Sequence, residues 1–399
     1  MPDLLKILAV FTAIMLLQRL KWNVGYVLLS VSGLLALLYL MSPAAIISTV
    51  RTTVTAPVTI ELFFALTMIR ALEMIMREKE VMAGMMETSR RLLRRKRAVI
   101  VSMPMLIGLL PSLGGAYFSA PMVEESTKGL NMSREEKGYI NYWFRHPWEF
   151  VLPLYPGIVL ASALTKIELN RFIPANAVYA SLLVVSGLVL SMRSVGGQFG
   201  ERKLEETRHR KGLWNFFPVA SVLFMVIFLH VELHYALALI VLSLFIYYGY
   251  SAGEIIKTLR CGFAMDVIVL ILGIMIFKYT LEDCHAVAGL SAYFTDKSIP
   301  ILPILILLPF ISGLLTGITV GFVGSTFPLL ISFAGGAHLN QMTLAFAAGF
   351  SGVLLSPVHL CLVLTREYFK ADMAGIYRKI LPGIVIIMTA AIAEYFILG

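Results

Sequence analysis

Long apolar segments alternate with short polar connections along the whole chain. Apolar segments recur, for example, at 24–41, 172–191, 235–248 and 381–398, and a run near 18 residues is long enough to cross roughly 30 Å of hydrocarbon. The alternation typical of a membrane β-barrel is missing. In lipid, helices are then the remaining structure that pairs every backbone N–H and C=O group. The pattern therefore predicts an all-α membrane protein.

Two of these apolar segments, 98–128 and 299–331, are interrupted in the same way by Gly, Pro, Ser and Thr. The arm 98–110 is too short to cross the membrane, because 13 residues of helix reach only roughly 20 Å. We therefore expect each segment to be a re-entrant helix–turn–helix hairpin. The alternative for the first segment is one long helix kinked at Pro111.

The order of expected elements repeats, which divides the chain into a first half (1–191), a cytoplasmic linker (192–211) and a second half (212–399). A basic loop is expected at 77–97. Each half is expected to contain five transmembrane helices, one of them broken, and one hairpin, forming an inverted-repeat transporter fold. The expected helices cover 3–18, 24–41, 58–76, 138–165 (broken), 172–191, 213–230, 233–249, 263–279, 342–365 (broken) and 381–398.

Charge placement predicts the orientation. The chain is 58% hydrophobic and only 14% charged, with a net charge of +9, whereas a soluble domain carries about a quarter charged residues. If both termini lie outside and each hairpin returns to its side of entry, most of the 33 Lys and Arg residues fall on the cytoplasmic side. The first hairpin would then enter from the cytoplasm and the second from outside.

The basic residues flank helices, so we expect them to contact membrane lipids, with the run 90–97 on anionic headgroups, and we expect no nucleic-acid partner. The run 4–18 lacks a small-residue cleavage site and is interpreted as a retained helix. Cys261, Cys284 and Cys361 show no paired spacing for zinc or a redox dithiol.

Both hairpin tips have the composition of a substrate or ion site. A helix that starts at mid-membrane exposes N–H groups that can hold an anion, and one that ends there exposes carbonyls that can hold Na⁺. The alternative is that small residues simply allow helices to pack closely. The candidate residues at the tips are Ser112, Gly114, Gly115, Ser119, Thr316, Thr319, Gly321, Ser325 and Thr326.

The broken helix 138–165 supplies charged candidates. Ionisable residues deep in a membrane segment are functional candidates, and Arg145, His146 and Glu149 lie several turns past an expected capping box. The alternative is an Arg145–Glu149 pair at i,i+4 that neutralises itself. No third ligand lies near His146 and Glu149 in the sequence, so no metal is predicted. Tyr155 is a further substrate-binding candidate, and Pro147, Pro153 and Pro156 cause the break.

The second broken helix is interrupted at Ser356 and Pro357, and His359 follows directly. Imidazole titrates near neutrality, so His359 is a candidate proton carrier; the alternative is a structural, hydrogen-bonded histidine. Ser356 is a candidate substrate contact, and Asp266 is a weaker proton-relay candidate.

Three motifs carry a resemblance to a family. Residues 118–124 (FSAPMVE), 140–149 (INYWFRHPWE) and 352–365 (GVLLSPVHLCLVLT) resemble the prokaryotic membrane family called domain of unknown function 401. That family is similar to the ion transporter superfamily of gluconate, citrate, divalent-anion/sodium and arsenite carriers. The resemblance implies inverted repeats, hairpins, frequent dimers and elevator-type alternating access. The Ser-Asn-Thr tip motif of the divalent-anion branch is absent here.

Together these observations predict a secondary active transporter, by symport with H⁺ or Na⁺, of a small anionic, carboxylate-like solute. We expect no enzymatic activity and no cofactor beyond Na⁺ as coupling ion, and the resemblance implies a homodimer. Two alternatives stay open: a membrane-embedded enzyme that uses Arg145, His146, Glu149 and His359, and a cation/proton antiporter. A channel would need a continuous polar pore, and too few helix faces are polar.

Overall fold

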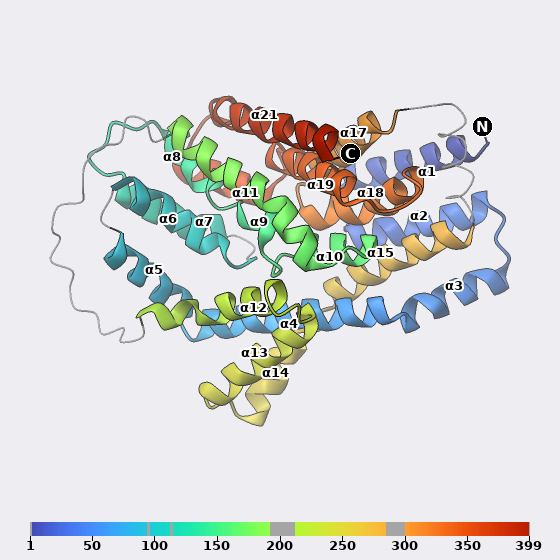
Figure 1. Ribbon diagram of the computed structural model, residues 1–399, viewed down its shortest axis with the longest axis horizontal. Helices are drawn as coiled ribbons and strands as arrows, with labels where there is room; N and C mark the ends of the chain where they lie inside the picture. Colours follow the sequence, from blue (N-terminus) through green and yellow to red (C-terminus); the bar gives the residue numbers. More distant parts are fainter. Residues whose placement is uncertain (1, 94–95, 112–114, 192–211, 285–299, 399) are drawn as a thin grey trace.

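The computed structural model describes residues 2–93, 96–111, 115–191, 212–284 and 300–398. These residues form an all-helical structure, which confirms the predicted fold class (Figure 1). The helices before residue 192 are α1 (Pro2–Arg19), α2 (Val24–Leu38), α3 (Pro43–Thr55), α4 (Pro57–Glu78), α5 (Val81–Leu92), α6 (Lys96–Gly108), α7 (Gly115–Ser126), α8 (Arg134–Trp143), α9 (Trp148–Val151), α10 (Pro156–Thr165) and α11 (Leu169–Ser191).

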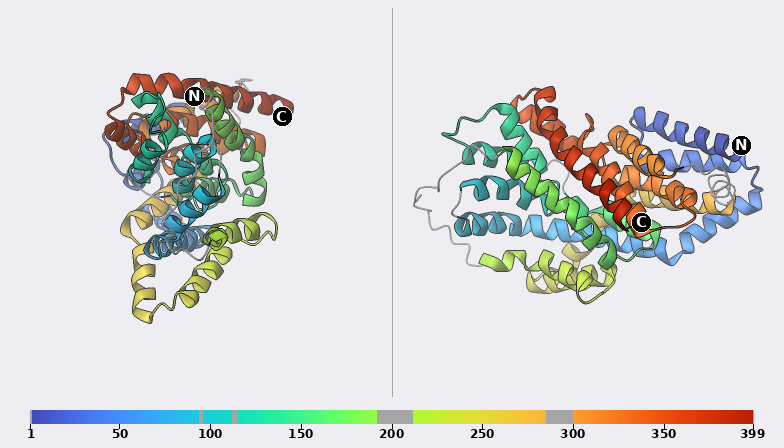
Figure 2. Two further views of the ribbon diagram at one scale, coloured as in Figure 1. Left: turned by 90° about the vertical axis from the view of Figure 1, so that its left-hand side faces the viewer. Right: turned by 45° about the horizontal axis from the view of Figure 1, so that its top comes forward.

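The helices after residue 211 follow a similar order. They are the 3₁₀ helix η1 (Gly212–Phe216), α12 (Phe217–Ile227), α13 (Leu233–Tyr247), α14 (Ala252–Gly262), α15 (Met265–Asp283), α17 (Leu302–Thr316), α18 (Thr319–Phe333), α19 (Leu339–Leu354), α20 (Leu360–Phe369) and α21 (Met373–Leu398). Helices α13 and α14 project from one side of the body (Figure 2). The expected linker 192–211 lies outside the described residues.

Helices of the first half pack against helices of the second half. Helix α7 packs against α20, and α10 packs against α18; α2 packs against α15, and α4 against α13. Helices α10 and α20 even end alike, each at a lysine in the left-handed conformation, Lys166 (φ 59°) and Lys370 (φ 50°). The halves are therefore interlocked, and the segments that follow the two helix breaks lie against the hairpin of the opposite half.

Helix lengths support a multi-pass membrane protein. Within the described residues, three helical stretches are long and apolar enough to cross a membrane: Arg134–Thr165, Leu169–Ser191 and Met373–Ile397. The pair α14 and α15, bent by 43°, makes a fourth if it is one span. The other apolar helices are shorter, so helix length alone supports fewer crossings than the ten expected from the sequence.

Both interrupted segments form helix–turn–helix pairs. Helices α6 and α7 pack side by side, as do α17 and α18, so the alternative of one long helix kinked at Pro111 is wrong. The second turn is made by Gly317 with φ 65°, a conformation that glycine adopts without strain. Residues 112–114 of the first tip lie outside the described residues.

Both segments predicted as broken helices are interrupted in the structure. The first stops at Trp143, makes one short turn as α9 and resumes at Pro156; the second stops at Leu354 and resumes at Leu360. Pro147 is the N-cap of α9, Pro156 is the first residue of α10, and Pro153 and Pro357 lie in the non-helical stretches. The predicted capping box of Ser133 and Glu136 opens α8.

Three helices occupy stretches where the sequence analysis expected loops. Helix α3 is capped by Ser42, whose hydroxyl accepts from the Ala45 N–H, and α14 is opened by the capping box of Ser251 and Glu254. Helix α5 covers most of the expected basic loop 77–97. These helices are polar on one face, so a search for apolar runs overlooks them, although the capping signals of α3 and α14 are local.

A cluster of aromatic side chains fills the centre of the molecule between α9, α18 and α19. The Phe150 ring lies edge-on to Phe350, with centroids 4.8 Å apart, and Phe346 contacts both Phe150 and Phe322. All four rings are fully buried. This packing fixes the first helix break against α19, directly beside the polar residues described next.

Candidate functional site

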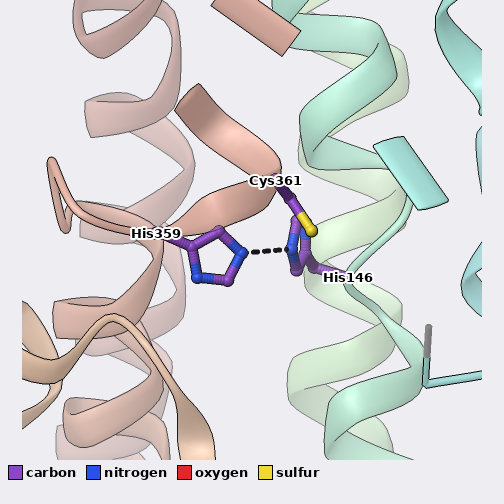
Figure 3. Close-up of side chains that lie close together, drawn as sticks. All are labelled: His146, His359 and Cys361. Carbon is purple, nitrogen blue, oxygen red and sulfur yellow. Dashed lines mark hydrogen bonds between the residues drawn. The ribbon is translucent and has the colours of Figure 1, made fainter. Parts of the chain in front are cut away.

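Two buried histidines from different halves of the chain face each other. His146 lies in the break between α8 and α9, and His359 is the N-cap of α20. Their Nε2 atoms are 3.1 Å apart (Figure 3). The side chains are almost inaccessible, with exposed fractions of 1% and 6%. The two candidates proposed separately from the sequence thus belong to one cluster.

The second nitrogen of each ring fixes its tautomer. His146 Nδ1 lies 2.6 Å from the Tyr142 carbonyl oxygen, and His359 Nδ1 lies 2.6 Å from the Gly317 carbonyl oxygen. A carbonyl oxygen only accepts, so each Nδ1 carries a hydrogen and donates it. In the neutral rings both Nε2 atoms then present lone pairs to each other at 3.1 Å. A proton or a metal ion between the rings would remove the repulsion between these lone pairs.

Cys361 and Glu149 complete this cluster. The Cys361 sulfur and the ligand nitrogens of His146 and His359 all lie within 4.8 Å of one another (Figure 3). A Glu149 carboxylate oxygen is 3.9 Å from His146 Nε2. We call His146, Glu149, His359 and Cys361 the histidine cluster. Cys361 was missed by the sequence analysis because its partner His146 lies in the other half of the chain.

Arg145 joins the first hairpin to this region. Its side chain is 4% exposed, and its guanidinium lies so close to Gly115 that an added methyl group there would collide with it. Gly115 is the first residue of α7. Arg145 therefore places a cation at the N-terminal end of the helix that follows the first turn.

Hydroxyl groups of the second hairpin are bonded within the hairpin itself. Ser325 lies 2.8 Å from the Ser312 hydroxyl and donates to the Gly321 carbonyl. Thr326 donates to the Phe322 carbonyl. Thr316 donates to the Ser312 carbonyl and packs against Gly321. Of these bonds, the one between Ser312 and Ser325 joins the two arms, and the others lie within single helices.

In the first hairpin, Ser119 belongs to a buried network that joins α7, α8 and α20. Its hydroxyl donates to Asn141 Oδ1 at 2.6 Å. The Asn141 amide donates to the Ala116 carbonyl at 3.0 Å and to Thr365 Oγ1 at 2.8 Å. The sequence analysis did not single out Asn141 or Thr365. The predicted candidates Ser112 and Gly114 lie outside the described residues.

The remaining candidates tie each break to a hairpin. The Tyr155 hydroxyl donates to the Gly108 carbonyl at the end of α6. Thr319, the first residue of α18, packs against Gly157 at the start of α10. Ser356 accepts from the Val358 N–H at 3.4 Å and lies beside Gly317. The breaks and hairpin turns are thus in direct contact.

Asp266, the weaker proton-relay candidate, lies in an ion pair with Arg70. Its carboxylate receives two hydrogen bonds from the Arg70 guanidinium, at 3.2 and 2.7 Å, and its side chain is 56% exposed. This bidentate pair joins α4 to α15 near the bend between α14 and α15. An exposed ion pair of this kind contributes little to stability.

Both histidines of the histidine cluster are buried among packed side chains, and Cys361 is partly exposed. A cavity of about 680 Å³ opens elsewhere, between α4, α10, α12 and α13, and none of the predicted site residues lines it. Its polar lining includes Glu61, Lys166, His230 and His234. The cavity and the histidine cluster are therefore separate features of the structure.

These features define a multi-pass, all-helical membrane protein with a buried histidine cluster where its two helix breaks meet. The chain belongs to the family described as protein of unknown function DUF401, which matches residues 4–398. None of the curated proteins compared with the chain matches it.

Proposed function

We propose that the protein is a secondary active transporter of a small anionic solute, coupled to H⁺ or Na⁺. One observation carries this proposal: both helix breaks and the second hairpin turn converge on one buried polar cluster. His146 comes from the first break, His359 comes from the second, and His359 donates to the Gly317 carbonyl of the turn. Broken helices that meet at the middle of the membrane are where transporters hold their substrates.

The charges around this meeting point favour an anion. Helices α7, α10, α18 and α20 all begin at the breaks and turns, and each helix start contributes a partial positive charge and free N–H groups. Arg145 adds a full positive charge beside the start of α7. The Gly317 carbonyl and the Glu149 carboxylate are the neighbouring oxygens that could hold a coupling cation.

The arrangement of the halves supports alternating access. The similar order of elements and the exchanged packing of α7 with α20 and of α10 with α18 are expected for an inverted repeat. In this proposal α6–α7 and α17–α18 are re-entrant hairpins, and 192–211 is a cytoplasmic linker between repeats 1–191 and 212–399. Both termini are extracytoplasmic, and the protein works as a homodimer by an elevator motion, as in the ion transporter superfamily. The enclosed cluster corresponds to an occluded state.

A membrane-embedded enzyme is the second candidate, because Arg145, His146, Glu149 and His359 do occupy one region of the structure. Such an enzyme would need a substrate path to the cluster, and both histidines are buried in the described structure. A cation/proton antiporter would use the same residues without an anion.

The test begins with a thermal-shift screen of the purified protein against carboxylates, oxyanions and cations. Solutes that stabilise the protein are then assayed for uptake into proteoliposomes under an imposed H⁺ or Na⁺ gradient. The variant Arg145→Gln should lower uptake at least roughly tenfold, since it removes the charge at the start of α7. The matched control Arg171→Gln, at an exposed position, should leave uptake unchanged. Solute turnover by protein in detergent, without vesicles, would contradict transport and favour the enzyme.

A further inference from the structure

We propose that the histidine cluster binds one transition-metal ion, with His146 Nε2, His359 Nε2 and Cys361 Sγ as ligands and Glu149 as the fourth. The inference goes beyond the proposed function, because it concerns a bound cation and holds or fails whether or not the protein transports a solute. The ion would link the two halves, since His146 and Glu149 belong to the first break and the other two ligands to the second.

The distances between the ligand atoms suit a single ion. Two nitrogens bound tetrahedrally to zinc, with Zn–N bonds of about 2.0–2.1 Å, lie about 3.3 Å apart. The observed Nε2–Nε2 distance is 3.1 Å. The sulfur lies within 4.8 Å of both nitrogens, and a small side-chain rotation brings it to a Zn–S bond of about 2.3 Å.

The hydrogen bonds behind the histidines are those that metal ligands use. A metal-bound histidine donates its other ring N–H to a carbonyl or carboxylate, which fixes the tautomer and the ring orientation. Here both Nδ1 atoms donate to backbone carbonyls, those of Tyr142 and Gly317, at 2.6 Å. Both Nε2 lone pairs are thereby aimed at one point, and an ion at that point removes their mutual repulsion.

The donor types select the class of metal. Two imidazole nitrogens and one thiolate suit Zn²⁺, Co²⁺ or copper, whereas Mg²⁺ and Ca²⁺ require oxygen ligands. A divalent ion balanced by the Cys361 thiolate and the Glu149 carboxylate adds no net charge to the buried cluster. Glu149 reaches the ion by shortening its present 3.9 Å distance to His146 Nε2.

The experiment uses Co²⁺ and Zn²⁺ as probes of the full chain in detergent. Wild-type protein should bind one Co²⁺ and show the near-ultraviolet band of a cobalt–thiolate bond together with the visible bands of tetrahedral Co²⁺. Added Zn²⁺ should displace the Co²⁺ and abolish both. Cys361→Ser should eliminate the thiolate band and weaken Co²⁺ binding at least roughly tenfold. Cys261→Ser, at an exposed cysteine, is the matched control and should bind as wild type does.

Thermal unfolding of each variant shows whether it is folded, and His359→Gln serves as a second variant that should lose the visible bands. Failure of wild-type protein to bind either ion stoichiometrically would overturn the metal site, and the facing nitrogens would then share a proton. An unchanged Co²⁺ spectrum in Cys361→Ser would overturn it as well. Metal binding without gradient-driven uptake would refute the transport proposal alone, and uptake without metal binding would refute this inference alone.

Discussion

At the scale of single residues, neighbouring backbone groups fix the orientation of the side chains in the site. Two backbone carbonyls fix the tautomers of His146 and His359 and turn their Nε2 atoms toward each other. Close backbone approach fixes Arg145, because only a glycine at position 115 leaves room for its guanidinium. The chemistry of the cluster thus depends on small residues and carbonyls as much as on the ionisable groups.

Gly115→Ala tests the placement of Arg145. The new methyl group would collide with the guanidinium, so we expect destabilisation of about 1–3 kcal/mol and reduced solute uptake. The measurement is denaturant or thermal unfolding in detergent, followed by the uptake assay. Gly33→Ala in α2 is the matched control, because nothing lies within 4 Å of its added methyl group; it should be neutral or stabilising by up to about 1 kcal/mol. Equal effects of the two substitutions would contradict the placement.

The sequence predicted His146, Glu149 and His359 as candidates because ionisable residues near proline breaks in apolar segments are rare. It could not predict their pairing, since 213 positions separate the two histidines and no local pattern carries that contact. The same reason explains why Cys361, Asn141 and Thr365 were overlooked. Asn141 bonds Ser119 and Thr365 from two other helices, and its own neighbours in the chain give no hint of either.

At the scale of elements, prolines and glycines determine where helices stop. Pro147 is the N-cap of the short α9, Pro156 begins α10, and Gly317 turns the chain between α17 and α18. These breaks were predictable because proline and glycine act locally. Helices α3, α5 and α14 were overlooked, since their polar faces conceal them from a search for apolar runs.

Gly317→Ala tests the coupling between the second turn and His359. The substitution places an alanine in the left-handed conformation. Its methyl group would lie 3.0 Å from the His359 backbone nitrogen and 3.0 Å from the Ser356 hydroxyl oxygen. Gly249→Ala is the control, because its φ of 63° is similar but its methyl group has no neighbour within 4 Å. The control should lose about 1–2 kcal/mol from backbone strain alone. Gly317→Ala should lose more and should also disturb Co²⁺ binding; a smaller loss than in the control would argue against the contact.

At the scale of the whole molecule, the two halves repeat the same order of elements and interlock through their breaks and hairpins. The proposed repeat was predicted from the sequence because both Gly-rich turns interrupt apolar segments in similar surroundings. The packing of each half against the other could not be predicted from the sequence, because it is a property of the packed structure. Interlocking halves with a shared central cluster are the basis for the proposed alternating access.

An inverted repeat makes a sharp prediction about sidedness. Ser42 and Ser251 are exposed N-caps of the corresponding helices α3 and α14. In a background without Cys261 and Cys284, Ser42→Cys should react with an impermeant maleimide added to intact cells, whereas Ser251→Cys should react only after the membrane is opened. Reaction of both from the same side would be incompatible with inverted halves.

The central claim is that the buried cluster serves gradient-driven transport, and accumulation in proteoliposomes tests it most directly. With a solute identified by thermal shift, wild-type protein should raise the internal solute concentration above the external one while an H⁺ or Na⁺ gradient is present. An ionophore that collapses the gradient should release the accumulated solute, and Arg145→Gln should not accumulate it. Equilibration without accumulation, or consumption of the solute in detergent, would contradict the account.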